Sequence, residues 1–387
     1  MKKICVITGS RAEYGLLKPI ISKIEKDNQL KLQLVSTGMH LSTEFGLTYK
    51  EIENDGYRID EKIEILLSSD TAVGISKSMG LAMISFSECF TRLNPDLILV
   101  LGDRFEIFAA VSVAMVSRIP VAHLHGGEAT EGLIDEAIRH CISKMSYLHF
   151  TSTEEYRKRV IQLGEAPERV FNVGAIGIEN IKNINLLSKE ELEKQINFKL
   201  GEKFAIVTFH PVTLEKSSSE EQFRNLLGAL ECFEDLKIIF TKANSDTEGR
   251  IINQMIDEYV NKNLHKTIAF TSMGQLRYLS AIKHANVVIG NSSSGIIEVP
   301  EFKVPTINIG DRQKGRVQSK SVINCSTDIN EIFNAIKKSL DIEFRVMLKN
   351  VDHPYGDGEV SSKILSIIKS FLLDNKINIK KHFYDLR

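Results

Sequence analysis

The chain has 387 residues, of which 43% are hydrophobic and 26% are charged, and its formal net charge is −1. This length suggests two domains, each large enough for its own core. The balanced charge gives no reason to expect nucleic acid or an anionic membrane as a partner. No apolar run approaches the roughly 20 residues of a membrane-spanning helix, so we expect a cytoplasmic protein. The five cysteines show no paired or metal-like spacing, and we expect buried free thiols.

Short apolar runs alternate with segments of helical period through the first 175 residues. Uninterrupted β-rich apolar runs predict buried strands, and apolar residues three and four apart predict helices. Strands are expected at 3–9, 31–37, 97–102, 121–126 and 148–152, and helices at 14–26 and 72–92. Continuous apolar strands separated by helices are typical of a parallel sheet that is covered on both faces.

A polar, lysine-rich stretch at 175–200 interrupts this alternation, and we interpret it as an interdomain connection that contains a helix. A second series of strands is expected at 204–210, 237–243, 266–272, 285–291 and 304–310. Near the end of the chain, the helical period of ILSIIKSFLL predicts a final helix.

The two series predict an α/β fold with two doubly wound, Rossmann-like domains. We place the N-terminal domain at 1–175 and the C-terminal domain at 176–387, and a C-terminal helix of such folds often packs back on the first domain. The carboxyl ends of the two sets of strands are expected to face each other across a cleft, where such folds bind ligands.

Two predicted strand ends in the first domain carry polar side chains. The first strand ends in TGSRAEYG, where Gly9 and Gly15 permit a tight turn and the N–H groups of the next helix suit an anion. Arg11 adds a planar guanidinium suited to phosphate, although an ordinary polar turn also accounts for the pattern. In LGDRFE, Asp103 and Arg104 directly follow another strand. Asp103 either caps the next helix or serves as an acid or base.

The segment HLHGGEATEGLIDEAIRH (123–140) is dense in titratable side chains. They are His123, His125, Glu128, Glu131, Asp135, Glu136, Arg139 and His140. The double glycine lets the backbone approach a ligand closely, and the spacing of Asp135, Arg139 and His140 lets them share one face of a predicted helix. Imidazoles and carboxylates crowded just past a buried strand favour a site over a merely solvated helix start.

The second domain also places polar residues at predicted strand ends. FHPVT puts His210 next to the proline that ends one strand. NSSSGIIE (291–298) puts three serines and a glycine before a helix, which suits a diphosphate, although plain N-capping is the alternative. Glu298 is expected on the first turn of that helix, where it could accept hydrogen bonds from ribose hydroxyls. The loop GDRQKGR (310–316), with Arg312, offers cations that could close over phosphates.

Signatures of other site types are absent from the sequence. There is no Walker A motif, no HExxH and no GxSxG, and the histidines do not pair at metal-ligand spacing on a predicted helix. We therefore predict neither a catalytic metal nor a cofactor.

In their order along the chain, the motifs resemble those of the hydrolysing UDP-N-acetylglucosamine 2-epimerases of bacterial sialic acid synthesis. The matching segments are GSRAEYG, TGMHL, LGDRFEIF, HLHGGE, IDEAIRH, TSTEEYRKRVIQLGE, FHPVT, IGNSSSGIIEVP and TINIGDRQKGR, which span most of the chain. The resemblance implies a glycosyltransferase-B-like fold with the UDP-sugar in the interdomain cleft, and a homo-oligomer, either a dimer or a tetramer.

The resemblance also implies a two-stage reaction. UDP leaves by elimination, with loss of the proton on carbon 2, and a 2-acetamidoglucal forms. Water then adds across the double bond, and N-acetylmannosamine is released with UDP. Carbon 2 is weakly acidic, so a carboxylate base must be held close to it, and arginine and serine groups can stabilise the charge of the leaving diphosphate.

Carried over by position, the family's catalytic carboxylates match Asp103 and Asp135. Residues expected to bind the UDP-sugar are Arg11, His40, Arg104, Arg139, His210, Asn291, Ser292, Ser293, Ser294, Gly295, Glu298 and Arg312. Many relatives have an acid where this chain has His125, in an HIEGGE-like motif, and one residue fewer between Glu128 and Asp135. The remaining acid/base role therefore falls to Glu128 or His125.

Four other functions remain open from the sequence. A sister enzyme of the legionaminic acid route acts on UDP-2,4-diacetamido-2,4,6-trideoxyglucose and would carry the same UDP-holding motifs. A non-hydrolysing 2-epimerase would retain UDP on its product, although GSRAEYG and HLHGGE favour hydrolysis. A glycosyltransferase on this fold would need an acceptor site, of which the sequence shows no sign. A non-catalytic UDP-sugar sensor would not need so many acid and base groups.

Overall fold

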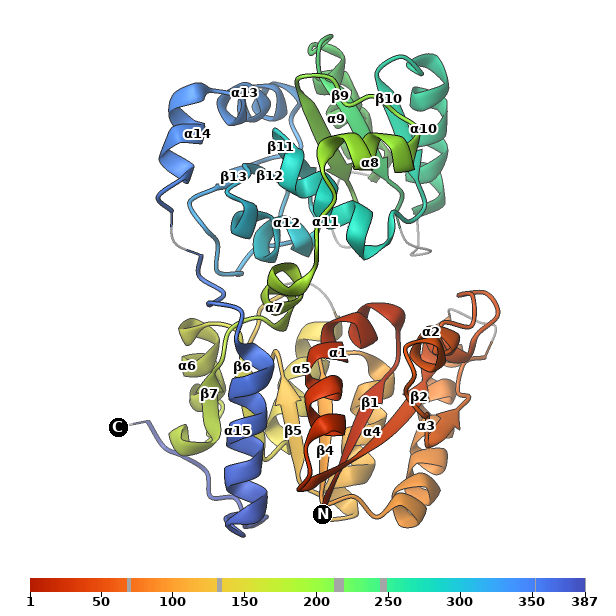
Figure 1. The fold of residues 1–387 in the computed structure, drawn as a ribbon, viewed down its shortest axis with the longest axis vertical. Coiled ribbons are helices and arrows are strands. Elements are labelled where there is room, and N and C mark those ends of the chain that lie inside the picture. Colours follow the sequence, from red (N-terminus) through yellow and green to blue (C-terminus); the bar gives the residue numbers. More distant parts are fainter. Residues whose placement is uncertain (68–70, 131–133, 212–218, 244–248, 352, 387) are drawn as a thin grey trace. The chain divides into compact units, whose positions relative to one another are not determined.

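The computed structural model describes residues 1–67, 71–130, 134–211, 219–243, 249–351 and 353–386. These residues form two compact units, which are coloured along the sequence in Figure 1. Unit 1 holds Met1–Ala129 together with residues 134–180 and 355–386, and unit 2 holds Ile181–Pro354 together with Thr130. The main boundary therefore follows Asn180, five residues later than the expected 175/176, and the last segment of the chain belongs to unit 1.

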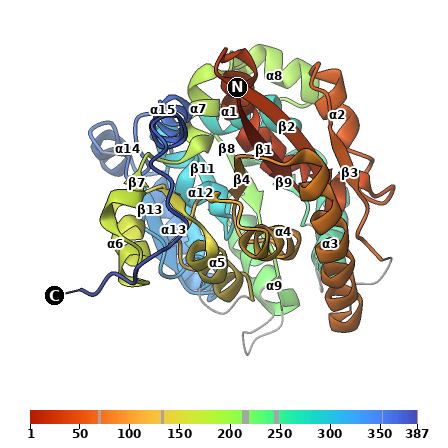
Figure 2. The ribbon, with the colours of Figure 1, turned by 90° about the horizontal axis from the view of Figure 1, so that it is seen from below.

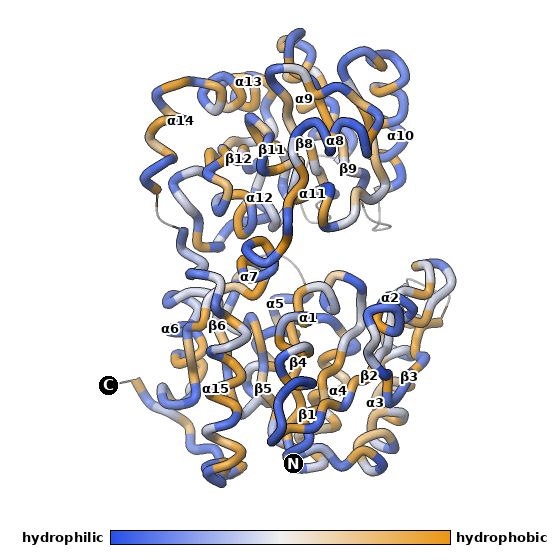
Figure 3. Tube along the Cα trace, viewed as in Figure 1, coloured by the Kyte–Doolittle hydropathy of each residue, from blue (hydrophilic) through white to orange (hydrophobic). Residues whose placement is uncertain are grey.

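Unit 1 is built on a seven-stranded sheet in the order β3-β2-β1-β4-β5-β6-β7, in which every strand pair is parallel. The strands are β1 (Lys2–Thr8), β2 (Leu30–Thr37), β3 (Glu61–Ile63), β4 (Leu97–Leu101), β5 (Val121–Leu124), β6 (Leu148–Thr151) and β7 (Val170–Asn172). The central strands β4, β5 and β6 are buried at every residue, as their continuous apolar runs predict. Figure 3 shows these hydrophobic strands inside the unit.

Helices cover both faces of this sheet, as the view from below in Figure 2 shows. The helices of unit 1 are α1 (Arg11–Lys26), α2 (Tyr49–Asn54), α3 (Ala72–Leu93), α4 (Phe105–Val116), α5 (Ile134–Met145), α6 (Glu154–Gln162) and α15 (Val360–Leu373), and α7 (Ile176–Asn183) begins in unit 1 and ends in unit 2. One face packs on α1 and α15, and the other packs on α3, α4 and α5. Helix α15 lies along α1, where Ile364 and Ile368 share a core with Leu17 and an ion pair joins Lys369 to Asp27.

Unit 2 repeats the design with six parallel strands in the order β10-β9-β8-β11-β12-β13. Its strands are β8 (Phe204–Thr208), β9 (Lys237–Thr241), β10 (Thr267–Phe270), β11 (Val287–Gly290), β12 (Thr306–Ile309) and β13 (Val322–Cys325). Its helices are α8 (Lys189–Ile196), α9 (Ser219–Glu231), α10 (Gly249–Lys262), α11 (Gly274–His284), α12 (Ser293–Ile297), α13 (Ile329–Ser339) and α14 (Ile342–Leu348). The predicted α/β class with two doubly wound parallel sheets is therefore confirmed.

Several details differ from the sequence prediction. The edge strands β3, β7 and β13 were not predicted, because each is short and only partly buried, so none forms a continuous apolar run. The connection at 175–200 contains two helices, α7 and α8, where one was expected. Helix α1 begins at Arg11, three residues early, because Ser10 and Glu13 form a capping box. Gly15 consequently lies inside the helix and not in the turn.

The cysteines are all free, but the expectation that they are buried holds only for Cys5 and Cys89. Cys141 is exposed on α5, Cys232 is exposed in the turn after α9, and Cys325 is partly exposed at the end of the edge strand β13. Within the described residues, no helix has both the length and the apolar character needed to cross a bilayer.

The parallel arrangement decides where the polar motifs of each unit gather. In unit 1, β1, β4, β5 and β6 are consecutive neighbours, so the residues after their carboxyl ends emerge at one edge of the sheet. In unit 2, β8 pairs with β11 in a register that aligns Thr208 with Gly290, so the residues that follow both strands emerge side by side. This edge is where doubly wound sheets bind ligands.

Candidate active site

Two buried carboxylates lie beneath the turn between β1 and α1. Glu13 accepts hydrogen bonds from the backbone N–H of Gly9 (2.6 Å) and Ser10 (3.2 Å), which closes the capping box. Glu106 is fully buried at the start of α4 and accepts from Arg104 Nε at 2.5 Å. Burial, reinforced by the charge of Glu106, raises the pKa of Glu13 to about 8. The Glu106 carboxylate therefore fixes the position of the Arg104 guanidinium.

Position 9 requires a glycine because the Glu106 side chain approaches its backbone closely. A Cβ at Gly9 would lie 2.5 Å from Glu106 Oε1 and 2.8 Å from its Cγ. We therefore expect Gly9→Ala to lower the free energy of unfolding by about 1–3 kcal/mol through overpacking. Gly15→Ala is the matched control, because nothing lies within 4 Å of its added methyl and an alanine inside a helix should stabilise by about 0.5–1 kcal/mol. Urea unfolding of both variants checks the opposite signs; equal losses would contradict the clash.

Arg11 and His40, both predicted to bind the UDP-sugar, have other partners within unit 1. Arg11 is exposed and forms an ion pair with Glu51 at 3.0 Å, so it is a surface cation beside the α1 turn. His40 is fully buried, with its Nε2 3.0 Å from Thr8 Oγ1 and its Nδ1 2.8 Å from Thr48 Oγ1. Burial lowers the pKa of His40 to about 4, so the ring is neutral near pH 7. A supporting role for His40 fits these contacts.

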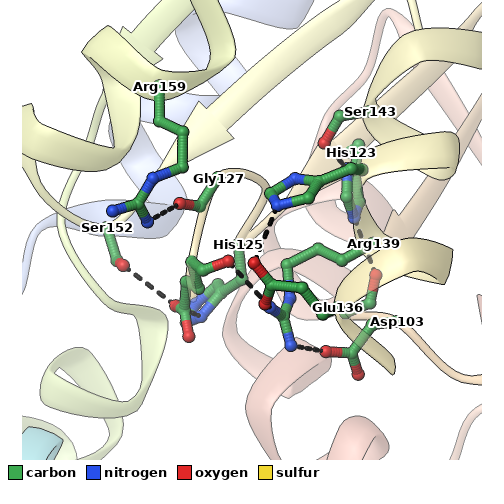
Figure 4. A network of polar contacts seen from close by, with 12 residues as sticks. Asp103, His123, His125, Gly127, Glu136, Arg139, Ser143, Ser152 and Arg159 are labelled. Atoms are coloured by element: carbon green, nitrogen blue, oxygen red, sulfur yellow. Dashed lines mark hydrogen bonds and ion pairs between the residues drawn. The ribbon is translucent and has the colours of Figure 1, made fainter. Parts of the chain in front are cut away.

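Asp103 and Arg139 pair within the polar network drawn in Figure 4. Arg139 Nη2 donates to Asp103 Oδ2, while Nη1 donates to the carbonyl oxygen of Glu128 (2.7 Å) and to Glu136 Oε2 (3.1 Å). Asp103 does not cap α4, whose N-cap residue is Arg104. The structure therefore removes the capping alternative for Asp103 and pairs its carboxylate with a buried guanidinium.

His125 and Glu128 form a second pair in the same network. His125 Nδ1 donates to Glu128 Oε1 at 2.9 Å, and Ser152 Oγ donates to the same oxygen at 3.0 Å. The backbone of His125 has φ +65°, a left-handed conformation that is uncommon outside glycine. Gly127 has φ +80°, and a Cβ there would meet the Tyr156 carbonyl at 2.4 Å. Backbone strain of this kind tends to cluster at functional sites.

The remaining titratable groups of 123–140 have separate surroundings. His123 is fully buried, and its Nε2 donates to the Gly102 carbonyl at 2.7 Å while its Nδ1 lies 3.2 Å from Ser143 Oγ. Burial lowers the pKa of His123 to about 3, so we interpret it as a structural histidine. His140 contacts Glu136 at 3.0 Å. Burial and the nearby Asp103 raise the pKa of Asp135 above its ordinary value. Glu131 lies outside the described residues.

In unit 2, His210 and Asn291 follow the paired strands β8 and β11 and are joined by two hydrogen bonds. The Asn291 side chain accepts from the His210 backbone N–H and donates to the His210 carbonyl, both at 2.8 Å. Arg312 Nη1 and Gln313 Nε2 both donate to the Asn291 carbonyl, at 3.0 and 2.9 Å. Burial, with a smaller effect of Arg312, lowers the pKa of His210 to about 4. Asn291 is thus a positioning residue for a neutral His210 and a nearby cation.

The serine segment differs from its prediction. Helix α12 has only five residues, so the argument from a positive helix end loses its basis, and Glu298 lies at the C-terminal end of α12 and not on its first turn. Ser292 is the N-cap residue, as the capping alternative predicts, and accepts from the N–H of Ser294. Ser294 donates to Glu298 and accepts from Tyr278 OH at 3.1 Å. A Cβ on Gly295 would lie 2.8 Å from the Thr306 methyl group, which explains the glycine.

The structure thus sorts the predicted residues into groups that the sequence did not reveal. Asp103, His125, Glu128 and Arg139 share one network in unit 1, with Asp135 close enough to interact electrostatically with Asp103. Sequence reasoning missed supporting residues that have no motif of their own, namely Glu13, Glu106, Ser152, Tyr278 and Gln313. Only Glu13 had a signal, since it stands three residues after the capping serine.

Two parallel doubly wound sheets with polar groups at their strand ends define an α/β protein with a glycosyltransferase-B-like fold. Solved structures share this fold. One is a UDP-GlcNAc 2-epimerase from Methanocaldococcus jannaschii in complex with UDP-GlcNAc and UDP (TM-score 0.78, 22% identity, 95% of this chain and 99% of that chain covered). Another is S. aureus MnaA with UDP (TM-score 0.76, 18% identity, 100% of both chains covered).

Comparisons of sequence define the family more closely. The profile described as UDP-N-acetylglucosamine 2-epimerase matches residues 22–369. The chain is 45% identical to the GDP/UDP-N,N′-diacetylbacillosamine 2-epimerase (hydrolyzing) of Campylobacter jejuni, over 100% of this chain and 99% of that protein. It is 41% identical to the polysialic acid biosynthesis protein P7 of Escherichia coli (100% and 98% covered). It is 34% identical to a UDP-N-acetylglucosamine 2-epimerase of Neisseria meningitidis (88% of each). The chain therefore belongs to the UDP-N-acetylglucosamine 2-epimerase family.

Proposed function

We propose that this enzyme is a hydrolysing 2-epimerase of UDP-linked N,N′-diacetylbacillosamine, a sugar with acetamido groups on carbons 2 and 4. The observation that carries the proposal is the 45% identity, over the whole chain, to the Campylobacter jejuni protein of that name. This substrate is the sister alternative of the sequence analysis, and it now ranks ahead of UDP-N-acetylglucosamine. The latter stays the second candidate, supported by the 34% identical Neisseria meningitidis protein and by the family's description.

In the proposed reaction, a base removes the proton from carbon 2 while the bond between carbon 1 and the UDP oxygen breaks. The electron pair of the C–H bond becomes the double bond between carbons 1 and 2, and UDP leaves with the bonding pair. Water then adds its hydroxyl to carbon 1, and a proton returns to carbon 2 on the opposite face. The net change is one sugar nucleotide and one water to UDP and the free 2-epimer.

The surroundings of the carboxylates support a division of roles. Asp103 is ion-paired with the buried Arg139. Burial and the charge of Asp103 raise the pKa of Asp135. A carboxyl group with a raised pKa is suited to donate a proton, and a second carboxylate beside it can serve as the base. We assign the role of base to Asp103 and that of acid to Asp135, and we assign binding of the UDP diphosphate to His210 and Arg312 in unit 2.

The experiment that tests the proposal is turnover in deuterated water followed by NMR. The pure enzyme is given UDP-N,N′-diacetylbacillosamine, its GDP-linked counterpart or UDP-N-acetylglucosamine in separate reactions. We expect release of UDP with a free 2-epimer that carries deuterium on carbon 2, and the highest kcat/KM for the UDP-linked diacetamido sugar. The GDP-linked compound is included because the Campylobacter jejuni relative is named for both nucleotides.

Each other outcome selects a different function. A higher kcat/KM for UDP-N-acetylglucosamine, with deuterated N-acetylmannosamine as product, would establish the second candidate. A 2-epimer still attached to UDP would indicate a non-hydrolysing epimerase. Binding of the sugar nucleotides without any turnover would contradict the enzymatic proposal.

A further inference from the structure

Arg139 is far less exposed than the carboxylates that it contacts. The side chain of Arg139 is 3% exposed, whereas those of Asp103 and Glu136 are 25% and 29% exposed. In Figure 4 the guanidinium points toward Asp103, and the chain of Arg139 approaches from helix α5. The guanidinium is therefore less accessible than the carboxylates, so a ligand at this edge of the sheet would contact the carboxylates before Arg139.

The guanidinium also joins three separate segments of unit 1. It bonds Asp103 after β4, the Glu128 carbonyl after β5 and Glu136 on the first turn of α5. A guanidinium stays charged at any accessible pH and presents its donors in a rigid planar fork, so it fixes the directions of the groups it binds. A buried arginine with two carboxylate partners is electrically compensated from within the protein, and it does not need a substrate anion for that purpose.

We propose that Arg139 is a positioning residue that acts through Asp103, and that it is not a residue that binds the UDP-sugar. This inference rests on the proposed 2-epimerase function. Arg139 holds Oδ2 of Asp103, and in the described part of the chain no hydrogen bond is directed to Oδ1, which is therefore free to meet carbon 2. The same guanidinium fixes the Glu128 backbone, so it sets the distance between Asp103 and the His125–Glu128 pair.

Steady-state kinetics of Arg139→Lys and Arg139→Gln test this role. We expect kcat to fall about 30-fold to 100-fold, because displacing a catalytic group by about 1 Å can slow a reaction by roughly 10²-fold. KM and the Kd for UDP should change less than about twofold, because an interaction with a positioning role is expressed in the transition state. Lysine keeps the charge but not the fork, so it should restore only part of the activity lost with glutamine.

A double-mutant cycle with Asp103→Asn separates a positioning role from a general structural one. If Arg139 acts through Asp103, the double variant with Arg139→Lys should be no slower than Asp103→Asn alone. Arg157→Lys is the matched control, because Arg157 on α6 likewise bonds a glutamate three residues earlier, Glu154, and a backbone carbonyl, that of Val170. Its kcat should stay within about twofold of wild type.

Different outcomes overturn the inference and the proposed function. A rise in KM or in the UDP Kd of tenfold or more, with kcat unchanged, would mean that Arg139 binds the substrate. Fully additive losses in the double variant would mean that Arg139 does not act through Asp103. Absence of turnover by the wild-type enzyme would instead contradict the proposed function. If Arg139→Gln fails to fold, Arg139→Lys, which retains the buried charge, still decides among these outcomes.

Discussion

Asp103→Asn is expected to lower kcat by a factor of about 10²–10⁴, the range that a positioned acid or base contributes. The substitution keeps the size of the side chain and its ability to accept a hydrogen bond from Arg139, but it removes the charge and the basicity. Affinity for UDP should stay within about twofold, because we assign UDP binding to His210 and Arg312 in unit 2. Steady-state kinetics and calorimetric titration with UDP measure the two quantities on one preparation.

Asp357→Asn is the matched control for this prediction. Asp357 lies in unit 1, is 62% exposed and pairs with Lys363 on the surface, away from the network of Asp103. Its turnover should equal that of wild type. A loss of UDP binding in Asp103→Asn would show that Asp103 holds the nucleotide or the fold, and unchanged kcat would remove it from the catalytic groups. Thermal unfolding of both variants checks that the buried Arg139 is still accommodated.

Glu165→Gln is expected to lower the free energy of unfolding by about 2–4 kcal/mol at neutral pH, because it removes one member of a buried ionic network. Glu165 is fully buried and bonds His149 at 3.1 Å, Lys144 at 2.8 Å and Lys381 at 2.7 Å. Lys381 belongs to the segment after α15, so the variant should also speed hydrogen exchange of that segment. Urea unfolding and hydrogen exchange measure the two effects.

The effect of Glu165→Gln should depend on pH in a defined direction. Burial opposes ionisation of Glu165, but its bonds to His149, Lys144 and Lys381 outweigh burial and lower its pKa from 4.5 to about 2. The ionised carboxylate therefore stabilises the fold above about pH 4.5, and this contribution is lost as the pH falls toward 2. The difference between variant and wild type should shrink over that interval.

Glu220→Gln is the matched control for the stability measurement. Glu220 is 41% exposed and pairs with Arg224 one helical turn away on the surface of α9. An exposed pair of this kind contributes about 0–1 kcal/mol, so the variant should unfold almost like wild type at every pH. Equal losses for Glu165→Gln and Glu220→Gln would show that burial of the Glu165 network adds nothing.

Local pattern was enough to locate the central strands, because a strand buried on both faces must be apolar along its whole length. The runs at β4 and β8 are buried at every residue, and β1 is buried from Ile4 onward; all three were predicted within one or two residues at each end. The edge strand β13 has one exposed position, three partly exposed positions and no buried one, so its sequence lacks the signal. The site motifs were found for a similar reason, since polar residues directly after buried strands stand out.

The roles of the individual polar residues were harder to predict than their positions, because a role depends on the contacts that the side chain makes. Arg139 and Arg11 are both arginines in polar motifs, yet one is 3% exposed in a network with Asp103 and the other is 52% exposed beside Glu51. Asn291 was predicted to bind the substrate, and in the structure its side-chain amide is hydrogen-bonded to the N–H and the carbonyl of His210. The cleft between two domains as the place of the reaction stays a prediction.

The sequence by itself determined the α/β class, the two strand series and the segments whose polar residues follow strands, because periodicity and burial are local properties of the chain. Tertiary structure alone decided which of those residues meet. Asp103 and Arg139 are 36 positions apart, and they pair only because β4 and β5 are neighbours and α5 follows on that edge. The partners that set charge and orientation at the site are distant in sequence, so only the sheet order brings them together.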